Sequence, residues 1–198
     1  MAPLREYMNK LKGQTAYLAG FIDDDKTGTA ASWRQDMTEF LNRNGIGSFD
    51  PMNKPILNTT VYEDKDFVDK VNKLKAEGEY EEVSRIMKEI VRQDLKMLDL
   101  CSLVILNIDR TCHMCGSYTE FTYACMQRKP VLIYCKQGIN AIPNWIYGLG
   151  NFSHFFDSWD KLKQHILDID SGKNTDDLDG KWRFFDYDKV FGRYITLD

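Results

Sequence analysis

Hydrophobic residues along this chain form two alternating patterns, short uninterrupted runs and longer stretches with helical spacing. The apolar runs predict buried strands at 16–21, 46–49, 102–106, 130–134 and 155–156. Between them, apolar residues return every three or four positions, which predicts helices at 30–41, 67–74, 83–98, around 120, 142–147 and 159–169. Near-continuous apolar strands are typical of parallel sheets buried on both faces. The alternation therefore predicts an α/β fold, a three-layer, flavodoxin/Rossmann-like doubly wound parallel sheet of about five strands with helices on both faces.

The length of 198 residues suits one domain with a full core. We expect a single domain over residues 1–198, with residues 52–80 as an insertion and residues 182–198 as an aromatic C-terminal tail. A tail this rich in aromatic residues is expected to dock, either on its own domain or on a neighbouring subunit.

Composition narrows the function classes. The net charge of −4, without a long basic run, argues against nucleic-acid binding. No apolar stretch approaches the roughly 18 residues that a membrane span needs, and residues 1–12 do not resemble a signal peptide. The five cysteines form an odd count, which fits reduced thiols better than a disulfide framework. We therefore expect a cytoplasmic protein without membrane partners.

Glu120 is the strongest candidate for a reactive group. It follows the apolar run that ends at Ile108-Asp109, and we expect it on the first turn of the next helix. One interpretation is a first-turn acid that complements the helix dipole, worth about 0.3–1 kcal/mol. The other is a reactive carboxylate in the crevice at the carboxyl ends of the strands, where α/β proteins bind ligands.

Two further residues extend this hypothesis. Asp94 shares one helical face with positions 83, 86, 90 and 97, which are all apolar. A carboxylate there lies either at the solvated edge of the stripe or in a functional position, because burying a lone charge is costly. Tyr17 lies in the first strand, where it is either a core residue or a hydrogen-bond donor to a catalytic carboxylate.

Together these residues resemble the nucleoside 2-deoxyribosyltransferase family. The resemblance covers about residues 16–134 and is carried by YLAGF at 17–21, QDL at 93–95, GSYTE at 116–120 with Ala124, and KPV at 129–131. Trp33-Arg34 and Phe49-Asp50-Pro51 are similar to bacteriophage-type members, which implies the host cytoplasm as the location.

The resemblance implies a role for each catalytic candidate. Glu120 is the nucleophile that attacks C1′ of a 2′-deoxynucleoside and forms a covalent deoxyribosyl ester, which a second base then resolves. Tyr17 orients Glu120, and Asp94 contacts the nucleobase and assists proton transfer to its ring nitrogen. The residues that the resemblance places around the substrate are Gly20, Phe21, Trp33, Gly116 and Ser117.

The sequence also departs from the family pattern. Transferases carry an Asp six residues before the nucleophile, where it binds the sugar hydroxyls, and this chain has Met114 there. Asp109 lies eleven residues before Glu120 and reaches the sugar only if the loop folds back. The related deoxynucleoside-monophosphate N-glycosidases also lack that Asp and bind a 5′-phosphate. Here the corresponding loop, 23–25, is three aspartates that repel phosphate, although Lys26, Thr27, Thr29 and Arg34 are near.

The resemblance further implies a homo-oligomer with shared active sites and no metal or organic cofactor. Asn140, or alternatively Asn144, corresponds to the Asn that a neighbouring subunit supplies, and the other interpretation of Asn140 is a plain turn residue. Cys112-His113-Met114-Cys115 resembles half a zinc site, but a structural site needs about four ligands. The three aspartates at 23–25 suit a solvated loop better than a hard-cation site.

Three functions stay open from the sequence. The first is deoxyribosyl transfer between nucleobases, with nucleosides or nucleotides and free bases as partners. The second is a nucleoside or nucleoside 5′-monophosphate N-glycosidase, which uses water as the acceptor. The third is a nucleotide-binding module that retains the pocket without turnover; Met114 favours it, while Tyr17, Asp94 and Glu120 argue against it.

Overall fold

The apolar runs form five strands that pair into one sheet. The computed structural model describes residues 9–22, 29–54, 65–173 and 182. The strands are β1 (Thr15–Gly20), β2 (Gly47–Phe49), β3 (Leu103–Ile108), β4 (Val131–Cys135) and β5 (Phe155–Phe156). Their order is β2-β1-β3-β4-β5, and every pairing is parallel. The predicted doubly wound parallel sheet is therefore confirmed.

The strand order places a topological switch point between β1 and β3. From β1 the chain first moves outward to β2 and then crosses back to build β3, β4 and β5 on the other side. In open α/β sheets, ligands bind in the crevice outside the carboxyl ends of the strands at such a point. Gly20 at the end of β1 pairs with Asn107 of β3, so these two residues mark that edge.

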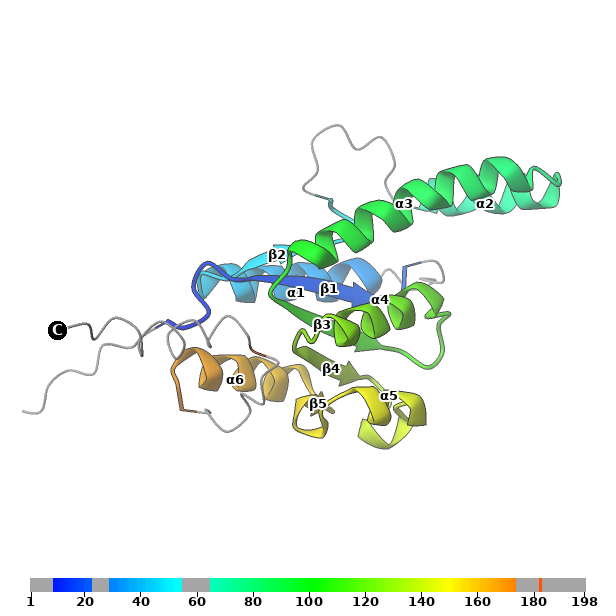
Figure 1. Cartoon of the computed structure of the whole chain (residues 1–198). Helices are drawn as coiled ribbons and strands as arrows, with labels where there is room; N and C mark the ends of the chain where they lie inside the picture. The colour runs from blue at the N-terminus through cyan, green and yellow to red at the C-terminus, as the bar shows by residue number, and fades with distance from the viewer. Residues whose placement is uncertain (1–8, 23–28, 55–64, 174–181, 183–198) are drawn as a thin grey trace, which may run out of the picture.

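Helices cover both faces of the sheet (Figure 1). The α1 and α6 helices pack on one face, in a core that includes Met37 and Ile166. The α3, α4 and α5 helices pack on the other face, in a core that includes Leu98 and Phe121. The bounds are α1 (Thr29–Arg43), α2 (Lys65–Ala76), α3 (Tyr80–Leu100), α4 (Cys115–Met126), α5 (Asn144–Leu149) and α6 (Trp159–Asp170), with short 3₁₀ turns at Ile139–Ala141 (η1) and Phe152–His154 (η2).

The long α3 helix serves two regions of the molecule. Its C-terminal half packs against the sheet, with Met97 and Leu98 buried. Its N-terminal half extends away from the sheet together with α2, and the two helices form a projecting pair (Figure 1). A helix of 21 residues is about 30 Å long, so one rigid element connects the projecting pair to the core.

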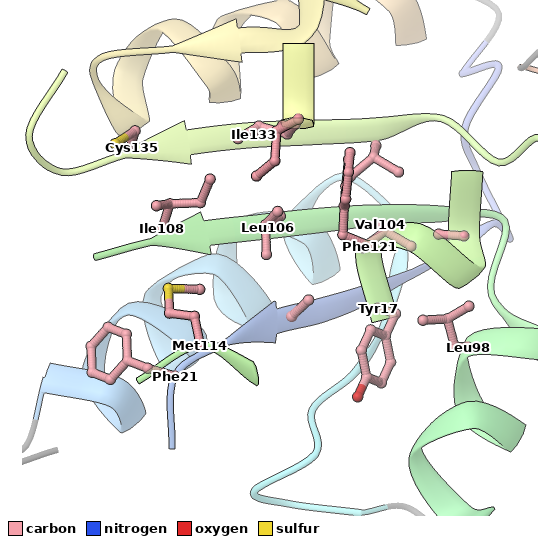
Figure 2. Close-up of a cluster of buried hydrophobic side chains, with 14 of the residues drawn as sticks. Tyr17, Phe21, Leu98, Val104, Leu106, Ile108, Met114, Phe121, Ile133 and Cys135 are labelled. Carbon is pink, nitrogen blue, oxygen red and sulfur yellow. The ribbon is translucent and has the colours of Figure 1, made fainter. Parts of the chain in front are cut away.

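The core of the α3–α4 face explains how Tyr17 is held. Figure 2 shows the Tyr17 ring projecting from β1 on the side of the sheet that carries Leu98 and Phe121. Tyr17 itself has no exposed surface. Its ring is thus a core side chain, and only its hydroxyl needs a polar partner.

Arg34 is a buried charge that fixes the exit of β1. Its guanidinium donates to the carbonyl oxygens of Gly20 at 2.8 Å, Ala30 at 2.7 Å and Phe21 at 3.3 Å. Its Nε donates to Leu18 O at 3.3 Å. A planar guanidinium with five donors suits such a set of carbonyls. Arg34 therefore ties α1 to the carboxyl end of β1.

The predicted helices and strands lie close to the observed ones. Trp182 is the one residue of the expected tail that the structure describes. Trp182 is 1% exposed and packs in the core on the α1–α6 side, so this part of the tail docks on its own domain. Residues 183–198 lie outside the described part of the chain. Within the described residues, we find no helix with the length and apolar character that crossing a bilayer requires.

Candidate active site

Tyr17 and Glu120 come from different elements and meet at the switch point. Tyr17 is on β1 and Glu120 on α4, 103 positions later in the chain. The hydroxyl of Tyr17 donates a hydrogen bond to Oε1 of Glu120 at 2.5 Å. Burial, the nearby charges of Glu120 and Asp94, and this hydrogen bond raise the pKa of Tyr17 well above its ordinary value. Tyr17 is thus a neutral donor that fixes one oxygen of Glu120.

The predicted position of Glu120 on the first turn of its helix is wrong. The α4 helix begins at Cys115, and its first turn contains no acidic residue. Glu120 is the sixth helical residue and lies on the second turn. The interaction of a carboxylate with the helix dipole falls off beyond the first turn. The dipole interpretation therefore accounts for Glu120 poorly, while the bond from Tyr17 gives it a specific partner.

Asp94 is paired with a lysine that sequence reasoning did not identify. Asp94 is 8% exposed on the apolar face of α3, as the spacing predicted. Lys54, in the segment after β2, places its Nζ 2.7 Å from Oδ1 of Asp94. The side chain of Lys54 has no exposed surface. The sequence did indicate that Asp94 needs a cationic partner, because a carboxylate on an apolar helical face is costly to bury alone.

A cavity of about 340 Å³, which we call the Glu120 pocket, brings the two carboxylates together. This volume falls within the range of small-molecule sites. Four of the predicted substrate-binding residues line it with Glu120 and Asp94: Gly20, Phe21, Gly116 and Ser117. The lining residues that sequence reasoning missed are Ile22, Met87, Ile90, Val91, Leu95, His113, Cys115 and Thr119. The apolar members come mainly from α3 and the polar members from the start of α4, so the two walls differ in chemistry.

Gly20 allows the end of β1 to approach α1 closely. A Cβ atom at this position would lie 2.9 Å from Cζ2 of Trp33 and 3.3 Å from Nη2 of Arg34. Contacts under 3 Å force a neighbour to move. Glycine at this point therefore lets β1 pass directly between the pocket and the α1 side chains.

Trp33 and Asp109 do not line the Glu120 pocket. They line a second cavity of about 270 Å³, which we call the Asp109 pocket, at the same edge of the sheet on the α1–α6 side. Phe21 lines both pockets. Trp33 stacks on Trp159 with ring centroids 5.3 Å apart, and Tyr134 lies against Trp159 at 4.1 Å.

Asp109 is held by donors of its own chain. Lys136 Nζ lies 2.8 Å from one carboxylate oxygen, and Gln137 Nε2 lies 2.7 Å from the other. The backbone N–H and the hydroxyl of Thr111 bond the same oxygen as Gln137, at 3.0 Å and 2.6 Å. Burial acts to raise the pKa of Asp109, but the bonds from Lys136, Thr111 and Gln137 outweigh it and hold the pKa well below its usual range. These contacts organise the loop after β3.

Met114 is a core residue, and Asn140 lies apart from both pockets. Met114 is 4% exposed, and its sulfur accepts the backbone N–H of Asp109 at 3.3 Å. Figure 2 shows Met114 near Phe21 beside the sheet. Asn140 is exposed on the short η1 turn, and Asn144 is exposed at the start of α5. Neither asparagine lines the described part of the Glu120 pocket.

The remaining polar candidates do not add a metal site in the described chain. Over residues 9–22, 29–54, 65–173 and 182, no three His, Cys, Asp or Glu side chains gather as metal ligands. None of the five cysteines forms a disulfide. The three aspartates at 23–25, with Lys26 and Thr27, lie outside the described residues. Arg34, which the sequence placed near a phosphate loop, is committed to backbone carbonyls.

Comparisons with known proteins agree with this geometry. Residues 16–166 match the family described as nucleoside 2-deoxyribosyltransferase. A comparison with curated proteins found none that matches the chain. The family match begins in β1, ends in α6 and thus includes Tyr17, Asp94 and Glu120. The chain therefore belongs to the nucleoside 2-deoxyribosyltransferase family, a family of glycosyl-transferring enzymes.

Proposed function

We propose that this protein transfers a 2-deoxyribosyl group between nucleobases through a covalent ester on Glu120. The observation that carries the proposal is the 2.5 Å hydrogen bond from the Tyr17 hydroxyl to Glu120, at a pocket that Asp94 also lines. A nucleophile must hold its geometry toward the reacting atom. The bond from a fully buried ring fixes Glu120 in this way, because the Tyr17 ring cannot shift without disturbing the core.

In the first half-reaction, a carboxylate oxygen of Glu120 forms a bond to C1′ as the C1′–N bond breaks. The electron pair of the broken bond leaves with the base, which gains a proton at a ring nitrogen. The developing positive charge on the sugar lies next to the carboxylate, which stabilises it before the bond forms. Asp94 faces the base from the α3 wall and assists this proton transfer.

In the second half-reaction, a ring nitrogen of the acceptor base attacks C1′ and the ester bond to Glu120 breaks. The proton of that nitrogen returns, with the help of Asp94, to the group that protonated the first base, and the carboxylate of Glu120 is restored. Each step inverts C1′, so the product keeps the configuration of the substrate. The apolar α3 wall, with Met87, Ile90 and Val91, suits the flat faces of the two bases.

Hydrolysis is the second candidate, and Met114 is the observation that favours it. Met114 is buried in the core at the position where transferases place an aspartate for the sugar hydroxyls. Asp109 does not substitute for it, because its oxygens bond Lys136, Gln137 and Thr111. The polar groups at the start of α4, such as Ser117 and Thr119, are the described candidates for sugar contacts. A weakly held sugar gives water a better chance to resolve the ester.

The deciding experiment is incubation of the protein with each 2′-deoxynucleoside and its 5′-monophosphate, with and without a second free base, followed by HPLC. A new deoxynucleoside that requires the acceptor base establishes transfer. Release of free base without an acceptor establishes hydrolysis. No product with any substrate contradicts both enzyme functions and leaves the nucleotide-binding module.

A matched pair of variants tests the nucleophile. Glu120→Gln keeps the shape of the side chain and removes the nucleophilic oxygen, so turnover should fall by about 10³-fold or more. Glu39→Gln, on the exposed face of α1, makes the same chemical change away from the pocket and should retain full turnover. Mass spectrometry of quenched reactions should show one deoxyribosyl group on the Glu39→Gln protein and none on the Glu120→Gln protein.

A further inference from the structure

The Asp109 pocket contains a buried amide that none of the roles above uses. Asn107 of β3 is 6% exposed and lines this cavity. Side chains alternate between the two faces of a strand, and Leu103 and Ile105 of the same strand pack in the core on the α1–α6 side. Asn107 therefore points to that side as well. Within the part of the chain that the structure describes, its side-chain amide forms no hydrogen bond.

An unsatisfied amide at this position is costly and needs an explanation. A buried polar group that loses water without gaining a partner destabilises the fold, so such groups are rare in native proteins. A leucine or isoleucine, as at the two earlier positions on this face of β3, would avoid the cost. Asn107 also lies at the carboxyl end of β3, beside the switch point, where α/β proteins bind ligands. A ligand that pairs with the amide accounts for both observations.

Aromatic rings surround this amide. Trp33 of α1 and Trp159 of α6 stack with ring centroids 5.3 Å apart and planes at 11° to each other, and the ring centroid of Tyr134 lies 4.1 Å from that of Trp159. All three rings line the cavity. Tyr134 is the partner of Asn107 in the register of β3 and β4, so the amide and the phenol lie side by side. Flat ring systems pack favourably on aromatic walls, and a few polar groups then fix their orientation.

The charges around the cavity disfavour an anionic ligand. Lys136 bonds one oxygen of Asp109 at 2.8 Å, and Gln137 bonds the other. Asp36, which is exposed on α1, adds a second carboxylate to the lining. Two carboxylates and one ammonium leave a net negative charge, which repels a phosphate. The volume of about 270 Å³ lies just below the usual range of small-molecule sites, roughly 300–1,000 Å³. The cavity therefore suits one or two fused rings better than a nucleotide.

We propose that the Asp109 pocket is a second binding site, separate from the Glu120 pocket, for a neutral planar heterocycle with a lactam edge, in which a ring N–H stands next to a carbonyl. The amide of Asn107 is complementary to that edge, because Nδ2 donates to the carbonyl oxygen and Oδ1 accepts from the ring N–H. The rings of Trp159 and Tyr134 contact the apolar part of the ligand. Oxopurines, oxopyrimidines and simple bicyclic lactams belong to this class. Binding at this site does not depend on turnover at Glu120.

The first test compares two ligands of the same shape that differ by one donor. Isoquinolin-1-one is a bicyclic lactam, and isocoumarin has a ring oxygen in place of its N–H. Calorimetry with the wild-type protein should give a Kd about 10-fold or more tighter for the lactam, because the lactone leaves Oδ1 of Asn107 without a donor. Equal affinities, or binding of neither compound, overturn the proposal.

A matched pair of variants then locates the ligand. Asn107→Leu should raise the Kd of the lactam by about 10-fold or more and abolish its advantage over the lactone. Asn42→Leu, at an exposed position of α1, makes the same chemical change away from the cavity and should leave both Kd values unchanged. If Asn107→Leu keeps the preference for the lactam, the ligand binds elsewhere and the proposal fails.

Tryptophan fluorescence identifies the cavity independently and decides the question if Asn107→Leu does not fold. Trp33 and Trp159 line the Asp109 pocket, whereas no tryptophan is among the described residues that line the Glu120 pocket. The lactam should therefore quench the emission of the wild-type protein, and Trp159→Phe should reduce that decrease by about half or more. Trp145→Phe, at an exposed position of α5, should leave the decrease unchanged. A decrease that Trp159→Phe does not alter puts the ligand outside the Asp109 pocket and contradicts the proposal.

Discussion

The Glu120 pocket and the Asp109 pocket lie at the same edge of one sheet and share Phe21, yet they differ in how their acids are satisfied. Each contains a buried aspartate that contacts a lysine, Asp94 with Lys54 and Asp109 with Lys136. In the Asp109 pocket, donors of the surrounding loops engage both oxygens of the acid. In the Glu120 pocket, two acids stand in the cavity wall.

The two aspartates thus differ in their surroundings: the side chain of Lys136 is 56% exposed, whereas the side chain of Lys54 is buried. The contacts of Asp109 connect the loop after β3 to residues 136 and 137 after β4. These hydrogen bonds hold the two loops together. Among the residues that line that pocket, Trp33 and Tyr134 both pack against Trp159. We therefore expect the acids of the Glu120 pocket to contribute to catalysis, because they line a ligand-sized cavity. We expect Asp109 to contribute to the stability of the fold, because it bonds residues of its own chain.

The largest effect that tests this contrast is on activity. Tyr17→Phe removes the hydroxyl that holds Glu120 and keeps the ring in the core, so kcat/KM should fall by about 10- to 100-fold. The free energy of unfolding should fall by only about 1 kcal/mol, the usual value of one hydrogen bond. Steady-state kinetics and urea denaturation measure the two quantities. If Tyr17→Phe lowers the free energy of unfolding but keeps kcat/KM, then Tyr17 has a structural role and not a catalytic one.

Asp109→Asn should show the opposite profile. It removes the charge that Lys136 contacts, and the free energy of unfolding at pH 7 should fall by about 2 kcal/mol, while kcat/KM stays within about threefold. Because the folded protein holds the pKa of Asp109 low, its contribution is present above the unfolded value near 4 and is lost as pH falls further. The difference between wild type and variant should thus shrink in acid. A larger loss of activity than of stability would contradict the contrast between the two pockets.

A smaller effect on the free energy of unfolding should appear above pH 10. The raised pKa of Tyr17 means that an unfolded tyrosine, near pH 10, loses its proton before the folded one. The stabilisation is therefore complete below pH 10 and is lost as pH rises, by about 1 kcal/mol between pH 10 and 11. Denaturation of wild type and Tyr17→Phe over this interval should converge by that amount. Parallel curves would mean that the folded protein does not protect the Tyr17 proton.

The smallest predicted effect concerns Gly116. A Cβ atom at this helical position meets nothing within 4 Å, and alanine favours a helix over glycine by up to about 1 kcal/mol. Gly116→Ala should therefore stabilise the protein slightly. Gly116 also lines the Glu120 pocket, so the added methyl group should raise KM with little change in kcat. An unchanged KM would show that the substrate does not contact this wall of the pocket.

The sequence allowed the sheet and part of the site to be predicted, because both depend on local patterns. The six residues of β3 are all buried, and such a run has few alternatives to a central parallel strand. The resemblance brought Tyr17 and Glu120 together, and they do lie in contact. The start of α4 was misplaced because it depends on how the loop of residues 109–114 closes, which periodicity does not specify.

The partners of buried charges were harder to predict from the sequence than the helices and strands, because these partners lie far away along the chain. Lys54 lies 40 positions from Asp94, and Lys136 lies 27 positions from Asp109. Each pairing depends on which loops meet at the carboxyl edge once the sheet has formed. Arg34 was a similar case, because its carbonyl partners become neighbours only when α1 packs beside β1.

The Arg34 contacts also have a consequence for protein engineering. The guanidinium anchors Leu18, Gly20 and Phe21 on one side and Ala30 on the other, so both ends of the segment between β1 and α1 are fixed by a single side chain. A segment with both ends clamped can be exchanged for others of matching span while the strand and helix keep their places. Loops of other sequences grafted between residues 22 and 29 should therefore leave β1 and α1 in place, provided that Arg34 is unchanged.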